Sequence, residues 1–139
     1  MATENPTKFF VIEEFVSELT LETYGERICW GFLDHRILRA ADRLRRDFGP
    51  LLCNTWLFGQ TRTESGLRVP GMVYYREGSQ HAHGRALDLM PMDTTADEMR
   101  YAIKHDRKRY KDITGIEEGV PWLHIDCRYP ERKLQEFSK

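Results

Sequence analysis

The chain has 139 residues, of which 40% are hydrophobic and 31% are charged, and its formal net charge is -1. This length supports one compact core and is too short for two ordinary domains, so we expect a single domain over residues 1–139. A net charge so close to zero argues against binding to nucleic acid or anionic membranes through a strong overall field. No apolar run approaches the roughly 20 residues that a helix needs to span a bilayer.

The beginning of the chain and its cysteines bear on location. Residues 1–8 are polar and lack the apolar segment of a signal peptide, which predicts that the protein is made in the cytoplasm without a signal for export. Three cysteines, Cys29, Cys53 and Cys127, are widely spaced and odd in number. That pattern favours free thiols in a reducing compartment over a disulfide framework.

The first half of the chain predicts one clear helix. Residues 8–15 are compatible with a short strand or an irregular lead-in. Apolar residues then recur at helical spacing over residues 34–48, and Gly49-Pro50 ends that helix. Residues 51–58 are rich in apolar and β-prone side chains and predict a strand. A polar, glycine-containing loop follows over residues 59–78, and loops of this length inside a compact domain are usually functional.

The second half predicts two strands and a helix. Residues 85–90 form the first strand, and residues 95–108 form a helix that opens with a capping-box sequence. Residues 122–128 alternate cleanly and predict a strand with His124 and Asp126 on one face. The tail from residue 130 is polar, and we expect it to fray or to pack lightly. The fold class is therefore α+β, with a small, mainly antiparallel sheet and helices packed on it.

Two segments carry the chemistry. Residues 79–88 read Ser-Gln-His-Ala-His-Gly-Arg-Ala-Leu-Asp, and residues 122–126 read Trp-Leu-His-Ile-Asp. Together they offer His81, Asp88 and His124, two imidazoles and a carboxylate, which are the donors of a catalytic zinc site with one position open for water. Neighbouring strands can bring these residues together despite their distance in sequence.

The other histidines are weaker candidates. His35 and His105 stand alone and are expected to be ordinary surface or core residues. His83 forms a His-x-His pair with His81, but a His-x-His-x-Asp-His metal pattern would need Asp and His where Arg85 and Ala86 stand. We therefore expect His83 to line the cleft or to bind a ligand.

The pattern Ser-x-His-x-x-Gly-x-Ala-x-Asp of residues 79–88 resembles the signature of the D-alanyl-D-alanine metallopeptidase family. That family includes D-Ala-D-Ala dipeptidases and carboxypeptidases and phage L-alanyl-D-glutamate endolysins. Trp-x-His-x-Asp at residues 122–126 resembles its closing motif, and the resemblance spans roughly residues 54–128. It implies the hedgehog/D-Ala-D-Ala peptidase fold and zinc bound by His81, Asp88 and His124. The compact chain is most similar to the phage-encoded members.

The resemblance also implies roles around the metal. Ser79 matches a residue that helps to bind substrate, and Trp122 is expected to line the same cleft. Arg62 would polarise the scissile carbonyl and stabilise its developing negative charge, with Arg68 as the alternative. The aromatic residues Trp56, Tyr74 and Tyr75 are further candidates for the walls of the cleft, although such residues are at least as often core.

The catalytic base is where this chain departs from the family pattern. Many relatives carry a glutamate three residues before the third ligand, and here Pro121 occupies that position. Glu117 is the first candidate for the base, Glu118 the second and Asp126 the third. Asp126 has an alternative role, which is to orient a ligand imidazole through its free ring nitrogen.

These expectations describe a zinc-dependent peptidase that hydrolyses peptidoglycan stem peptides in the manner of an endolysin. Without a signal peptide it would reach the cell wall after release or delivery. With no appended wall-binding domain, its targeting would come from the domain surface or from a partner. One alternative is a D-Ala-D-Ala carboxypeptidase. The other is a non-catalytic zinc-containing module of a phage particle, which would keep the ligands but would not need the base.

Overall fold

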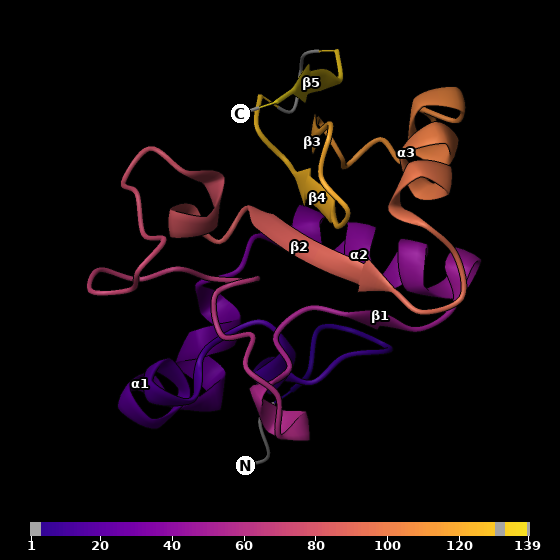
Figure 1. Cartoon of the computed structure of the whole chain (residues 1–139). Helices are drawn as coiled ribbons and strands as arrows, with labels where there is room; N and C mark the ends of the chain where they lie inside the picture. Colours follow the sequence, from indigo (N-terminus) through magenta and orange to yellow (C-terminus); the bar gives the residue numbers. More distant parts are fainter. Residues whose placement is uncertain (1–3, 130–132, 139) are drawn as a thin grey trace.

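The computed structural model describes residues 4–129 and 133–138 and has an α+β architecture (Figure 1). Within these residues, three α-helices accompany a five-stranded mixed sheet. The helices are α1 (Glu18–Gly31), α2 (His35–Phe48) and α3 (Ala96–His105). The strands are β1 (Leu51–Leu52), β2 (Ala86–Pro91), β3 (Gly115–Glu117), β4 (Leu123–Asp126) and β5 (Gln135–Phe137). Short 3-10 turns lie at η1 (Ile12–Glu14), η2 (Trp56–Phe58) and η3 (Gln80–His83).

The two predicted helices are confirmed, with well-defined beginnings. The Asp34 side chain accepts a hydrogen bond from the Arg36 amide at the start of α2, and the helix ends before Gly49, whose φ of 86° suits glycine. Thr95 caps α3 by accepting from the Glu98 amide. Both caps occupy amide groups that would otherwise lack partners in the first turn.

Helix α1 was not predicted from the sequence. Ser17 caps it by accepting from the Thr20 amide, but Gly25 has a φ of 80° and interrupts the helical geometry. Its outer face exposes Leu19 and Ile28, so apolar residues do not mark a single buried side. The expected strand over residues 51–58 is also corrected, because only Leu51–Leu52 are extended and the chain then turns into η2. The Trp56 indole there donates to the Val16 carbonyl at 2.9 Å.

The strands lie in the order β1-β2-β4-β3-β5. Three neighbouring pairs are antiparallel and β3 pairs with β5 in parallel. The sheet is therefore mixed, which confirms the expectation of a mainly antiparallel sheet only in part. The expectation of a fraying tail is wrong for residues 135–137, which form β5; residues 130–132 lie outside the described part of the chain.

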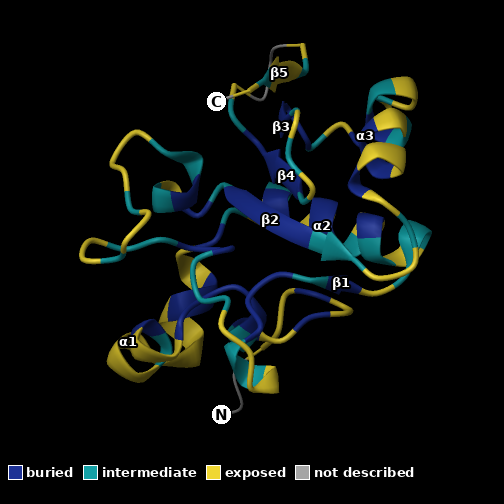
Figure 2. Cartoon of the chain, viewed as in Figure 1, coloured by how far each residue is buried: buried dark blue, intermediate teal, exposed yellow. Residues whose placement is uncertain are grey.

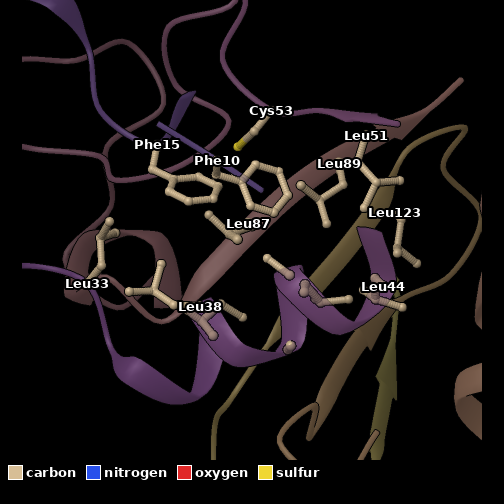
Figure 3. Packing of buried hydrophobic residues seen from close by; sticks show 14 of the residues in the cluster. Phe10, Phe15, Leu33, Leu38, Leu44, Leu51, Cys53, Leu87, Leu89 and Leu123 are labelled. Carbon is tan, nitrogen blue, oxygen red and sulfur yellow. The ribbon is translucent and has the colours of Figure 1, made fainter. Parts of the chain in front are cut away.

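The core lies between one face of the sheet and the helices. In Figure 3, Leu38 and Leu44 of α2 face Leu87 and Leu89 of β2, and Phe15 closes one end of the cluster. Figure 2 shows β2 and β4 as the most buried part of the fold, while α1 presents a largely exposed outer surface. Among the described residues, no helix is long and apolar enough to cross a membrane. The opposite face of the sheet is also buried, but its side chains are polar.

Candidate metal centre

A single row of residues crosses the second face of the sheet. Asp88 on β2 pairs with His124 on β4, and Glu117 on β3 pairs with Phe137 on β5. An adjacent row contains Ala86 opposite Asp126 on β4, and Asp126 also faces Gly115 on β3. Because side chains two residues apart along a strand share a face, the two rows build one polar surface. Alternation on β2 and β4 places Leu87, Leu89, Leu123 and Ile125 in the core on the other side.

His81 reaches this surface from η3, immediately before β2. Ser79 caps the turn and accepts a hydrogen bond from the His81 amide at 3.2 Å. Gly84 ends the turn with a φ of 67°, and a Cβ atom there would lie 1.8 Å from the Phe32 carbonyl oxygen. Only glycine fits this turn without a shift of the neighbouring backbone, and the turn fixes where His81 enters the site.

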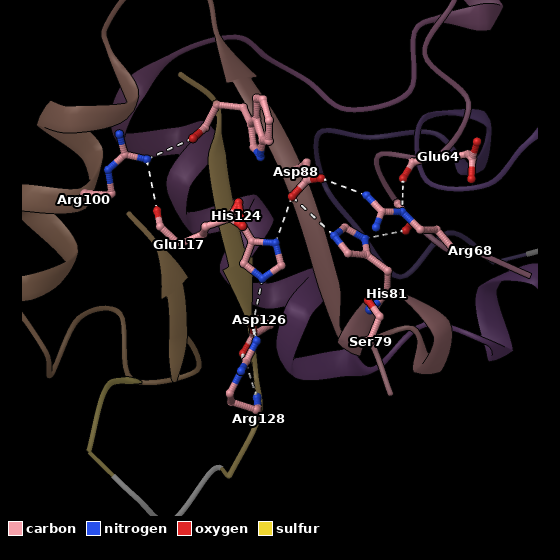
Figure 4. A network of polar contacts seen from close by, with 12 residues as sticks. Glu64, Arg68, Ser79, His81, Asp88, Arg100, Glu117, His124, Asp126 and Arg128 are labelled. Carbon is pink, nitrogen blue, oxygen red and sulfur yellow. Dashed lines mark hydrogen bonds and ion pairs between the residues drawn. The ribbon is translucent and has the colours of Figure 1, made fainter. Parts of the chain in front are cut away.

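Three donor atoms converge at the centre of the surface. Asp88 Oδ1 lies 3.3 Å from His81 Nε2 and 2.9 Å from His124 Nδ1, and the three atoms all lie within 4.8 Å of one another (Figure 4). All three residues are buried, with exposed fractions of 3%, 8% and 7% for His81, Asp88 and His124. This buried group could hold a metal ion.

The chemistry of the two imidazoles fits a metal. His81 Nδ1 lies 2.8 Å from the Gly66 carbonyl oxygen, and His124 Nε2 lies 2.8 Å from Asp126 Oδ2. A carbonyl and a carboxylate only accept hydrogen bonds, so these outer nitrogens must carry protons. In a neutral imidazole the inner nitrogen is then a lone-pair donor, which is the arrangement that holds histidine ligands in position around metals.

Both carboxylates beside the histidines are held by arginines. Arg68 Nη2 donates to Asp88 Oδ2 at 3.2 Å, which leaves Oδ1 for the imidazoles. Arg68 Nε in turn donates to the Glu64 carbonyl at 2.7 Å. Arg128 donates from Nε to Asp126 Oδ1 at 2.8 Å and from Nη2 to Oδ2 at 2.6 Å. Each acidic group is thus fixed in orientation by a bound guanidinium.

The electrostatics of the group follow from these contacts. Burial opposes the charge on His124, but hydrogen bonds to Asp126 and Asp88 outweigh it and raise the pKa of His124 to about 9. Burial also opposes ionisation of Asp88, yet hydrogen bonds from His124 and His81 hold its pKa well below the ordinary value. Without a metal, the centre is therefore held together by a protonated imidazole between two carboxylates.

A two-lobed cleft opens over the centre. One lobe of about 230 Å³ is lined by His81, His124, Glu117, Arg128 and Phe137, among others. The second lobe, of about 390 Å³, is lined mainly by residues 61–65 of the long loop and by Tyr74. Arg68, Asp88 and Trp122 line both lobes, so the candidate metal group lies where the lobes meet.

The structure separates the two candidate glutamates. Glu117 is buried, with 4% exposed, and lines the smaller lobe together with the histidines. Its carboxylate forms no hydrogen bond or ion pair with the described residues. Glu118 instead forms an ion pair with Lys104 at 2.5 Å, outside both lobes. Of the two, only Glu117 can reach a ligand in the cleft.

The remaining candidate residues also divide into those that line the cleft and those that do not. Ser79 and Trp122 line the cleft, whereas His83 is exposed and contacts the Glu77 carbonyl at 2.8 Å, away from it. Arg62 lines the larger lobe, and Arg68 contacts Asp88 of the candidate metal group directly. Asp126 is fully buried beneath His124, so it contacts the His124 imidazole and does not line the cleft. Of the three aromatic candidates, only Tyr74 lines a lobe.

Three contributors to the site were missed by sequence reasoning. Phe137 lies 5.2 Å from the His124 ring, centroid to centroid, and the Arg128 guanidinium lies 4.4 Å from the Phe137 centroid. Arg100 is buried and donates to the carbonyls of Trp122 and Val120 at 2.9 and 3.0 Å, which fixes the turn between Glu117 and Trp122. No sequence signal marked Phe137 or Arg100, but Arg128 sits two residues from Asp126 on an expected strand.

Comparison of the chain with protein-family models, with curated protein sequences and with solved structures found no match.

Proposed function

We propose that this protein is a zinc-dependent peptidase that hydrolyses stem peptides of peptidoglycan. The observation that carries the proposal is the convergence of His81, Asp88 and His124 at the floor of an open cleft, with an unpaired Glu117 in the same lobe. Two nitrogens and one carboxylate oxygen form the donor set of catalytic zinc, which keeps a position open. A purely structural zinc site usually closes its fourth position with another protein ligand.

A zinc ion held by these three residues would supply Lewis-acid chemistry and bring the pKa of water to about 7. Glu117 is the base in this proposal: it accepts a proton from the attacking water and delivers it to the departing amine. Its burial beside the histidines and its lack of a competing partner among the described residues favour that role over Glu118.

We assign the stabilisation of developing charge to Arg68, whereas the sequence pattern favoured Arg62. Arg68 lies beside Asp88 at the meeting point of the lobes and over the Tyr74 ring, and its two hydrogen bonds leave Nη1 without a hydrogen-bond partner in the described chain. A guanidinium held in this way can donate to a carbonyl oxygen that becomes negative, and it cannot lose its charge.

The first experiment measures clearing of purified Gram-negative peptidoglycan by the zinc-loaded protein, with and without a chelator. We expect chelator-sensitive clearing, and mass analysis of the fragments would identify the cleaved bond. No clearing by a protein that carries one zinc per chain would contradict the peptidase and favour a non-catalytic zinc module.

Matched variants test the base. Glu117→Gln should lower the rate by roughly 10²–10⁴-fold while zinc content stays unchanged, because the proton acceptor is lost and the ligands remain. Glu118→Gln is the control, since its partners are Lys104 and, at 3.8 Å, Arg100, and its carboxylate lies outside the cleft; it should retain activity. Equal activity of Glu117→Gln and wild type would show that another group is the base.

A further inference from the structure

The larger lobe of the cleft is rich in side chains that can donate hydrogen bonds. Arg62 and Arg68 line it together with the hydroxyl residues Thr61, Thr63 and Ser65. The Arg62 guanidinium forms no hydrogen bond or ion pair with any described residue, although the Arg62 backbone is fixed by Thr55. An arginine whose backbone is fixed and whose guanidinium has no partner is suited to bind a ligand.

Both carboxylates of this lobe have partners other than Arg62. Asp88 is held by Arg68 and by the histidines. Glu64 accepts a hydrogen bond from the Tyr74 amide at 2.9 Å. Two arginines therefore line the lobe, and neither acidic residue pairs with Arg62.

Trp122 adds a further unsatisfied donor. Its indole Nε1 is buried and has no hydrogen-bond partner in the described chain, and Trp122 lines both lobes. A buried N–H group without an acceptor costs free energy, and this edge of the cleft adds no acceptor that could compete for Arg62. The ligand that matches the guanidinium and hydroxyl groups of the lobe is an anion with several acceptor oxygens.

We propose that the larger lobe binds a free carboxylate of the substrate, with Arg62 as the residue that recognises it. This inference rests on the proposed peptidase function. The two substrate classes left open by the sequence share this feature. In a stem peptide, D-glutamate is linked to the next residue through its γ-carboxyl group, so its α-carboxylate is free and lies next to the L-Ala-D-Glu bond. A D-Ala-D-Ala peptide carries its terminal carboxylate next to the bond between the two alanines.

The test uses two pairs of synthetic peptides. In the first pair, the α-carboxyl group of D-glutamate in an L-Ala-γ-D-Glu stem peptide is either free or a primary amide. In the second, the terminal carboxyl group of a D-Ala-D-Ala peptide is free or amidated. For the pair that is cleaved, we expect kcat/KM to be roughly 10–100-fold higher for the free acid, as charge-assisted hydrogen bonds imply. The pair that shows this preference identifies the source of the carboxylate.

Arg62→Gln should remove the preference by raising KM for the acid, with kcat and the amide reaction little changed. Arg76→Gln is the matched control, because Arg76 lies on the same loop and is exposed, and among the described residues its side chain contacts only the Val73 and Tyr75 carbonyls. It should keep the preference, and both variants should melt at the temperature of wild type.

Three results separate this inference from the proposed function. Equal cleavage of acid and amide, or a preference that survives Arg62→Gln, would overturn the carboxylate site while the peptidase stands. If no peptide is cleaved, the proposed peptidase function is rejected. The carboxylate site is then tested by the dissociation constants of the same peptides. Tighter binding of an acid that Arg62→Gln abolishes would support the site, and equal binding would overturn it.

Discussion

Asp126 Oδ2 lies 2.8 Å from His124 Nε2, while the other ring nitrogen, Nδ1, faces Asp88. The carboxylate is fully buried and is itself held by two hydrogen bonds from the Arg128 guanidinium. His124 therefore cannot rotate without breaking a buried, charge-assisted contact. The orientation of one metal-ligand candidate is set by the chain Arg128–Asp126–His124, and this chain can be tested apart from the ligands themselves.

Asp126→Asn should lower zinc affinity by roughly 10–100-fold, because an amide holds the His124 N–H more weakly and makes the imidazole a poorer donor. Competition with a chromophoric chelator measures the effect. Asp112→Asn is the control, since it alters only a surface ion pair with Arg39 at 3.3 Å. Wild-type affinity in Asp126→Asn would mean that the contact with Asp126 does not support metal binding by His124. Undiminished zinc binding by His124→Ala would exclude the ligand set altogether.

The raised pKa of His124 predicts a pH dependence of zinc binding. Below a pKa of about 9 the metal-free protein carries a proton on His124, and zinc must displace it from Nδ1. Apparent affinity should therefore rise roughly tenfold per pH unit up to about pH 9, with release of about one proton per zinc. Affinity that is flat between pH 7 and 8.5 would contradict a protonated His124 in the metal-free state.

The same shift predicts the stability of the metal-free protein. The folded-state pKa of about 9 exceeds the ordinary value of 6.5, so folding takes up a proton between these pH values. The stabilisation is complete below about pH 6.5 and is lost as the pH rises through 9. Chelator-treated protein should thus melt at a lower temperature at pH 9 than at pH 6.5. His124→Gln should reduce this difference, since it removes the titrating group.

Much of the candidate site could be predicted because its residues lie in regular local structure. The alternation of residues 122–128 placed His124 and Asp126 on one face, and the glycine in residues 79–88 marked the turn before Asp88. The arginine role was harder to assign. Arg62 and Arg68 lie on one irregular loop, where no periodicity indicates which side chain faces Asp88. The contact of 3.2 Å between Arg68 and Asp88 arises from the tertiary fold.

The missed elements are short or weakly patterned. Strand β3 has three residues and β5 has three, so neither shows a repeat, and each is stabilised by its pairing with the other. Helix α1 contains Gly25 with a positive φ and lacks a clear apolar face. Where stability comes from partners far away in sequence, local pattern carries little information.

Gly115 is required by the register between β3 and β4. A Cβ atom at this position would lie 2.1 Å from Asp126 Oδ1, so Gly115→Ala must displace the carboxylate that holds His124. We expect a loss of stability of about 1–3 kcal/mol, as for overpacked sites, together with weaker zinc binding. Gly78→Ala is the control, because nothing lies within 4 Å of its Cβ position. Denaturant unfolding and chelator competition measure both effects, and unchanged zinc affinity in Gly115→Ala would argue against this coupling.

Phe137 connects the C-terminal strand to the candidate metal centre. Its ring packs against His124 and under the Arg128 guanidinium, and the backbone of β5 is joined to β3 by the Glu118 amide, which donates to the Phe137 carbonyl at 2.6 Å. Phe137→Ala removes an apolar wall of the smaller lobe and should admit water to the histidines. We expect a loss of about 1–2 kcal/mol in stability, less than for a fully buried phenylalanine, and a several-fold faster loss of zinc to a chelator.

Phe137→Leu separates the apolar wall from the ring interactions. Leucine keeps most of the covering volume but cannot accept the Arg128 cation on an aromatic face. If exclusion of water protects the centre, Phe137→Leu should lose zinc at nearly the wild-type rate. If Phe137 acts by holding Arg128 over Asp126, Phe137→Leu should resemble Phe137→Ala, and both should bind zinc more weakly at equilibrium. Wild-type zinc kinetics in both variants would mean that β5 contributes to the fold and not to the metal centre.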